Sequence, residues 1–189
     1  MHPKPLYVAA LIRTDLDTLW QHTQDPALHR RWDLRFTDIA PLTAGRFRYA
    51  TKVLGLRVTG LGTHSGERFR PDGTRTSVLR FASTDPLSLI RAGSGFWRYT
   101  PTDDGIRFVT GFDYDTRWGR FGTLAAVAFR PLFGWMTAWS FDRLRIWLET
   151  GTPPERQSPL APSAARCRRS RPTGRHGAAP RALAALERP

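Results

Sequence analysis

The stretch FGTLAAVAFRPLFGWMTAWSFDRLRIWLETG, residues 121–151, has helical character along its whole length. Gly151 marks its end, because glycine is the residue that most often follows the last turn of a helix. Pro131 lies inside the run, and proline removes a backbone hydrogen bond and clashes with the preceding turn. We therefore predict a long C-terminal helix that is interrupted at Pro131 and stops at Gly151.

The region between residues 34 and 118 alternates apolar and polar side chains with a period of two, which is typical of strands with one buried face. In GIRFVTGFDYDTRW, residues 105–118, Phe108 falls on one side and Arg107 on the other. The turn signals TAG, PDG and DDG separate such runs. They predict six antiparallel strands joined by hairpins. Glycines in GLGTHSGE, residues 60–67, predict a strongly curved sheet.

Two short helices are expected before this sheet region. LYVAALIR, residues 6–13, is apolar on both faces and predicts a first strand. Leu16, Leu19 and Trp20 then recur at helical spacing, with Thr14 or Asp15 as the cap. A second short helix is predicted from Pro26, because proline fits the first helical turn.

The chain after residue 151 differs in composition from the rest. Residues 152–189 are rich in Arg, Pro and Ala and contain no aromatic residue, so they cannot bury enough apolar area to offset ordering. We predict one domain over residues 1–151 and a disordered tail over residues 152–189. The tail carries eight arginines against two glutamates, a large share of the formal net charge of +13. Nucleic acid is therefore not expected to be the domain's partner, although attachment of the tail to nucleic acid or an anionic membrane stays open.

Cysteine and histidine usage bears on location and metal binding. Cys167 is the only cysteine, which excludes an intrachain disulfide framework. With no secretion signal recognisable near the N-terminus, we expect a cytoplasmic protein. His22 and His29 have no partner at metal-ligand spacing, so neither a metal site nor a cofactor is expected.

Residues 121–141 approach the length of a membrane span with Arg130 as their one charge. Pro131 and Gly134 interrupt them, so we do not predict a span. Peripheral contact with an anionic membrane is a separate possibility, because arginines near tryptophans suit a bilayer interface. The residues concerned are Trp135, Trp139, Trp147, Arg130, Arg143 and Arg145.

The order of predicted elements resembles the helix-grip fold of the START-like (SRPBCC) superfamily, which includes polyketide cyclase/dehydrase and lipid-transfer proteins. The resemblance covers residues 5–150 and includes LDTLWQHTQDPALHRRWD, residues 16–33, and WSFDRLRIWLE, residues 139–149. It implies an α+β fold in which a curved antiparallel sheet of about seven strands wraps around the long C-terminal helix. It also implies a cavity between the two. It assigns no catalytic residue.

Aromatic residues and one histidine have the strand or helix positions expected for the interior, where they either line a cavity or fill the core. These candidate ligand-binding residues are Trp32, Tyr49, His64, Trp97, Tyr99, Phe108, Phe112, Tyr114 and Trp135. The function predicted from them is the binding, for transport or sequestration, of a hydrophobic small molecule such as a lipid or polyketide. The alternative is an enzyme of the aromatase/cyclase type, with His64, Tyr49 and Tyr114 as the candidate proton-transfer groups. The oligomeric state is not predicted.

Overall fold

The structure, a computed structural model, describes residues 6–43, 45–53 and 55–157. Within these ranges seven strands form one antiparallel sheet in the order β1-β7-β6-β5-β4-β3-β2. The strands are β1 (Leu6–Ile12), β2 (Asp38–Pro41), β3 (Arg46–Val53), β4 (Leu56–Phe69), β5 (Arg75–Ala82), β6 (Ile90–Thr102) and β7 (Gly105–Thr116). The helices are α1 (Leu16–Gln24), α2 (Pro26–Trp32), α3 (Gly119–Thr150) and the short 3-10 helix η1 (Pro154–Arg156).

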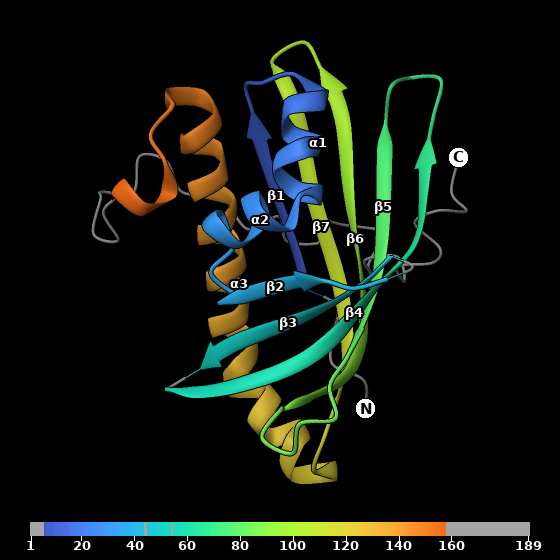
Figure 1. Ribbon diagram of the computed structural model, residues 1–189, viewed down its shortest axis with the longest axis vertical. Helices are drawn as coiled ribbons and strands as arrows, with labels where there is room; N and C mark the ends of the chain where they lie inside the picture. The colour runs from blue at the N-terminus through green and yellow to red at the C-terminus, as the bar shows by residue number, and fades with distance from the viewer. Residues whose placement is uncertain (1–5, 44, 54, 158–189) are drawn as a thin grey trace.

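The sheet bends around α3, and β2 and β3 cross β1 and β7 at a steep angle (Figure 1). The predicted α+β helix-grip architecture, with a curved antiparallel sheet around a long C-terminal helix, is confirmed. Register shifts between His64 and Gly66 and between Ile90 and Ala92 contribute to the bend, because a bulge locally increases strand twist.

The two short helices after β1 are also confirmed, and their starts are set by aspartates. Asp15 accepts a hydrogen bond from the backbone N–H of Thr18 at 2.7 Å, and Asp25 accepts one from Ala27 at 2.7 Å. These bonds satisfy N–H groups that have no partner within a first helical turn. Pro26 occupies the first position of α2, where it has no intrahelical bond to lose.

The predicted interruption of the long helix at Pro131 is wrong, because α3 continues through it from Gly119 to Thr150. Proline deprives the carbonyl of Val127 of its helical partner. Val127 is 70% exposed, so solvent can hydrogen-bond this part of the helix. The end of α3 follows the prediction. Gly151 adopts φ +72° and its N–H donates to the carbonyl of Trp147.

The largest buried side chains gather where α1, α2 and the C-terminal half of α3 meet β1, β6 and β7. Phe108 of β7 stacks on Phe141 of α3 with ring centroids 4.4 Å apart, and on Tyr99 of β6 at 4.9 Å. The hydroxyl of Tyr99 meets Thr23 Oγ1 at 2.7 Å, so its polar atom is satisfied inside the core. This part of the molecule is closely packed.

The residues directly after α3 depart from the predicted disordered tail. Pro154 is buried, and Arg31 of α2 pairs with Glu155 at 2.8 Å. Gln157 donates a hydrogen bond to the carbonyl of Arg143 at 2.9 Å. Order therefore extends past Gly151 through Gln157. The remainder of the predicted tail, residues 158–189, lies outside the described residues.

Candidate functional site

A cavity of about 210 Å³ lies between the concave face of β3–β7 and the N-terminal half of α3. Its lining comes from α2, the segment before β2, five strands, the β5–β6 loop and α3. The lining residues are His29, Arg35, Phe36, Phe47, Tyr49, Thr51, Val58, Leu79, Phe81, Leu87, Ser88, Leu89, Ile90, Gly95, Phe96, Trp97, Thr110, Phe112, Phe129 and Phe133. Most of this surface is aliphatic or aromatic, with a few polar groups.

The floor of the cavity is shaped by aromatic rings that lie on glycines of the neighbouring strand. The ring of Tyr49 covers Gly60, where an added Cβ would stand 2.4 Å from the ring. Phe47 covers Gly62 in the same way, at 2.1 Å. Only glycine leaves room for rings to lie this close to the backbone. The far ends of both rings therefore lie against the backbone of β4, and both residues border the cavity.

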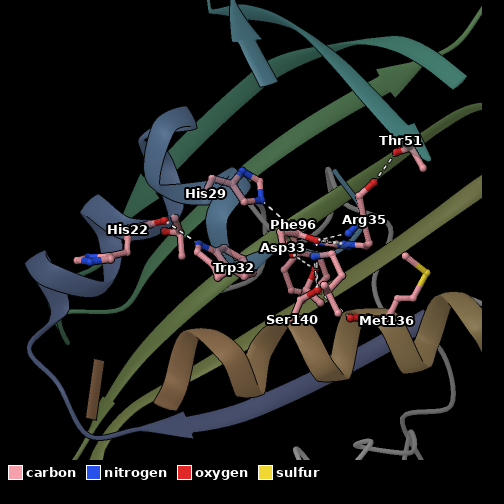
Figure 2. Close-up of polar contacts among 12 residues, drawn as sticks. His22, His29, Trp32, Asp33, Arg35, Thr51, Phe96, Met136 and Ser140 are labelled. Carbon is pink, nitrogen blue, oxygen red and sulfur yellow. Dashed lines mark hydrogen bonds and ion pairs between the residues drawn. The ribbon is translucent and has the colours of Figure 1, made fainter. Parts of the chain in front are cut away.

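One polar cluster faces this apolar space, and it centres on the buried carboxylate of Asp33 (Figure 2). Arg35 donates from Nε to Asp33 Oδ1 at 2.9 Å and from Nη2 to Oδ2 at 2.6 Å. His29 Nε2 lies 2.9 Å from Oδ2, and Ser140 Oγ of α3 lies 3.4 Å from Oδ1. Asp33 thus holds side chains from α2, α3 and the segment before β2 in one arrangement.

The electrostatics of the cluster keep Asp33 ionised. Burial alone would raise the pKa of Asp33, but the Arg35 guanidinium and the hydrogen bonds from Arg35 and His29 outweigh burial and hold that pKa well below its usual value. The Arg35 guanidinium also lies within 6 Å of the rings of Phe112 and Phe133. Arg35 Nη1 makes no hydrogen bond to any described residue, so it can donate one to a molecule in the cavity.

Local sequence explains how the cluster forms. Asp33 caps the C-terminus of α2 and stands four residues after His29, so the two side chains meet on one helical face. The backbone of the next segment is fixed from two sides. Thr51 of β3 donates to the carbonyl of Arg35, and Ser140 accepts from the N–H of Leu34 at 2.9 Å.

Tyr49 is the phenol among the cavity-lining residues, and burial raises its pKa to about 12. It therefore stays protonated at neutral pH and can donate a hydrogen bond. It is a poor base under the same conditions, which limits the chemistry it can perform.

The structure separates the predicted ligand-binding residues into three groups. Tyr49, Trp97 and Phe112 line the cavity. Trp32, Tyr99, Phe108 and Tyr114 are buried in the packed core instead. His64 and Trp135 are exposed to solvent. Strand alternation predicted an interior position for His64 as well, which is wrong, because alternation does not say how far along a strand the cavity or the core extends.

The structure does not bring the candidate proton-transfer groups His64, Tyr49 and Tyr114 together in the cavity, since Tyr49 alone of the three lines it. Although His64 is exposed, desolvation by neighbouring protein atoms lowers its pKa, and burial raises the pKa of Tyr114. The polar groups that do reach the cavity include His29 and Arg35, which sequence reasoning did not select. The available signal was the spacing of His29, Asp33 and Arg35 around the end of α2.

Metal binding has no geometric support in the part of the chain that the structure describes, where no three His, Cys, Asp or Glu side chains form a ligand group.

Comparisons with known proteins identify solved structures with a similar fold and a relative that is similar in sequence. No family model matches the chain. A Bacillus subtilis (strain 168) protein, "Uncharacterized membrane protein YndG", is 45% identical over 164 residues, which cover 82% of this chain and 61% of that protein. This chain therefore spans less than two thirds of its relative's length.

Solved structures share the fold at low sequence identity. TTHA0849 from Thermus thermophilus matches with a TM-score of 0.58 and 17% identity, over 78% of this chain and 99% of that one. The di-domain aromatase/cyclase StfQ from the steffimycin biosynthetic pathway matches with a TM-score of 0.59 and 11% identity, over 77% of this chain and 50% of that one. A protein from Deinococcus radiodurans, DR_A0006, matches with a TM-score of 0.54 and 15% identity, over 78% of this chain and 99% of that one. At these identities the matches establish the fold alone.

The expected cytoplasmic location is contradicted by the comparison, because the Bacillus subtilis relative is described as a membrane protein. Among the described residues, no helix has the length and apolar character needed to cross a bilayer.

Proposed function

We propose that this chain is a START-like protein that binds a small apolar molecule, with one oxygen-bearing end, in the cavity under α3. The observation that carries the proposal is an apolar, aromatic cavity with one buried guanidinium, that of Arg35, at its wall. Sites for small molecules commonly combine an apolar surface with a few fixed polar groups that orient the ligand.

The charge balance of the polar cluster indicates which kind of polar group the ligand carries. The charges of Arg35 and Asp33 compensate each other at 2.6 Å, so the pair as a whole has no net charge. A carboxylate ligand would bring an extra charge into an apolar space, which is costly without a further cation. A carbonyl or hydroxyl oxygen needs only the N–H that Arg35 Nη1 offers. We therefore favour a neutral, oxygen-bearing ligand.

The size of the cavity limits what it encloses. About 210 Å³ exceeds the roughly 150 Å³ of an apolar cavity that holds benzene, and it is below the usual range of about 300–1,000 Å³ for drug-sized ligands. A molecule with one or two rings fits inside. A longer molecule extends past Leu87, a lining residue that is 53% exposed and therefore lies at the opening.

A pair of probes that differ in one oxygen tests the proposal. We expect 2-acetylnaphthalene, a ketone, to bind at least about tenfold more tightly than 2-ethylnaphthalene, because a hydrogen bond to a charged group contributes about 1.5–3 kcal/mol. Quenching of tryptophan fluorescence and isothermal titration calorimetry measure both affinities. Equal affinities would remove the polar anchor from the proposal, and no binding of either probe would remove the proposal itself.

A matched pair of variants tests whether the cavity is the binding site. Leu79→Trp, in β5, places a large ring in the cavity, and we expect it to weaken probe binding at least about tenfold. Leu61→Trp makes the same change at an exposed position of β4 outside the cavity lining and should leave binding within about twofold. Equal binding by both variants would place the probe elsewhere.

A second candidate function is cyclisation of a polyketide-like substrate, and the placement of Tyr49 and Arg35 favours it. Both are hydrogen-bond donors at an apolar cavity that could hold a folded chain of ketones. A poly-β-ketone thioester incubated with the protein would lose one water on cyclisation and dehydration, which mass spectrometry detects. Tyr49→Phe should slow that step at least about tenfold. Absence of the product with the unmodified protein would exclude this candidate for the substrate used.

A further inference from the structure

The N-terminal half of α3 carries a stripe of exposed apolar side chains that lies outside the cavity lining. Phe121 and Leu124 are each 69% exposed, Leu132 is 40% exposed and Trp135 is 46% exposed. Their spacing places them along one side of the helix. From Phe121 to Trp135 the stripe is about 21 Å long at 1.5 Å per residue. Four large apolar side chains in a row on a surface indicate a site of interaction.

An adjoining side of the same helical segment lines the cavity. Phe129 and Phe133 line it, and they face the sheet where Phe133 meets Phe112 of β7 with ring centroids 5.1 Å apart. The start of α3 is tied to the β5–β6 loop, because the N–H of Arg117 donates to the carbonyl of Leu89 at 2.8 Å. In Figure 1 this loop and the start of α3 lie at the same end of the molecule. The stripe is therefore beside the opening of the cavity.

The charged side chains of residues 116–141 are all basic, and the flanking carboxylates Asp115 and Asp142 pair with Arg91 and Arg145. Residues 116–141 contain Arg117, Arg120 and Arg130 and no aspartate or glutamate. Arg120 is exposed, and so is Trp118, at 44%. Exposed tryptophan and phenylalanine beside arginine form the combination that favours the interface between lipid headgroups and acyl chains. An anionic headgroup complements the positive charge.

We propose that the stripe formed by Phe121, Leu124, Leu132 and Trp135 docks the protein on the surface of an anionic lipid bilayer, with α3 lying along that surface. A second copy of this chain is a less suitable occupant. A two-fold interface places the same patch of both copies face to face, which would bring the arginines of two segments together. The negative phosphate groups of lipids attract these arginines, whereas the arginines of a second copy would repel them.

This docking surface differs from the membrane contact expected from the tryptophans and arginines of the whole C-terminal helix. Trp147 packs against His22, with ring centroids 4.7 Å apart, and lies under the guanidinium of Arg31. Arg145 pairs with Glu149 at 3.0 Å, and Arg143 donates to the carbonyl of Arg31 at 2.9 Å. The tryptophan and arginine side chains of the C-terminal half of α3 thus make contacts within the protein. The N-terminal half carries the exposed stripe.

Vesicle co-sedimentation of the full chain tests the proposal, with vesicles of phosphatidylcholine containing about 30% phosphatidylglycerol, compared with pure phosphatidylcholine. We expect binding to the anionic vesicles at about 0.15 M salt. Leu124→Glu should weaken it at least about tenfold, because it places a charge in the acyl boundary. Leu61→Glu, the same change at a 41% exposed position of β4, should leave binding within about twofold.

Three outcomes would overturn the proposal. The first is no binding of the unmodified chain to anionic vesicles. The second is equal binding by Leu124→Glu and Leu61→Glu, which would assign the contact to another basic surface. The third is a dimer, measured by light scattering after gel filtration, that Leu124→Glu dissociates, which would make a second copy the occupant. None of these outcomes depends on whether the cavity binds a ligand.

Discussion

The two halves of α3 have similar apolar content but opposite surroundings. In the C-terminal half, Phe141 and Leu144 are fully buried against the aromatic core formed with α1, α2 and β7. In the N-terminal half, Phe121 and Leu124 are exposed, and the side facing the sheet borders a cavity. Hydrophobicity along a helix thus identifies side chains that need a partner without identifying the partner.

The difference has a geometric origin. α3 packs closely against β1 and also contacts β7. β3 and β4 run across α3 in Figure 1, and their residues line the cavity together with residues of α3. A strongly bent sheet is in close contact with a helix along only part of the helix, and here the remaining gap is the cavity. The molecule therefore has a closely packed half and a half that contains the cavity and the exposed apolar side chains of α3.

The largest effect should come from truncating the packed half. Phe141→Ala removes a ring stacked 4.4 Å from Phe108 and should lower the free energy of unfolding by about 4 kcal/mol, the cost of the lost burial and of the void. Phe121→Ala, at a 69% exposed position of the other half, should change it by less than about 0.5 kcal/mol. Urea denaturation followed by circular dichroism measures both. Similar losses of unfolding free energy in the two variants would contradict the distinction between a packed and an exposed half of α3.

Asp33→Asn should have the next largest effect on the free energy of unfolding. Asp33 lies between the packed core and the cavity. The variant leaves the Arg35 guanidinium buried without its counter-charge and should cost about 3 kcal/mol at pH 7. The folded-state pKa of Asp33 is depressed, so its stabilisation is complete above the ordinary aspartate pKa of about 3.9 and is lost as the pH falls towards the folded-state pKa.

The stability difference between the unmodified protein and Asp33→Asn should accordingly shrink below about pH 4. Chemical denaturation between pH 3 and pH 7 tests this dependence. Asp104→Asn, an exposed position in the β6–β7 turn, provides the control and should show no comparable loss at pH 7. A difference between the unmodified protein and Asp33→Asn that stays constant with pH would show that the charge of Asp33 is not what stabilises the cluster.

A smaller effect is expected from Gly60→Ala in the cavity floor. The added methyl would stand 2.4 Å from the Tyr49 ring and 2.8 Å from the carbonyl oxygen of Ala82, and should cost about 2 kcal/mol. The same substitution in a Tyr49→Ala background should cost less, because the ring is no longer there to be displaced. A double-mutant cycle by urea denaturation gives this coupling. Zero coupling would mean that the ring does not rest on Gly60.

Sequence patterns predicted the parts of this protein that depend on near neighbours. Strand alternation placed Phe112 and Trp97 on the concave face, and the glycines of the β4 region predicted its curvature. Helix preferences failed at Pro131, because packing and solvent on the outer side let α3 continue through a residue that usually ends a helix. The site was predicted less well than the fold, since alternation does not separate Phe112 at the cavity from Phe108 in the core.

The sequence by itself determined the order of elements, through the spacing of its apolar residues, and also the start of α2 at Pro26 and the end of α3 at Gly151, which depend on interactions within a few residues. Only the tertiary structure decided which aromatic residues border the cavity and that Asp33 joins His29, Arg35 and the distant Ser140. Those relations depend on where the curved sheet and α3 separate. Contacts between segments far apart in the sequence decide this position, as between Asp33 and Ser140, which are 107 residues apart.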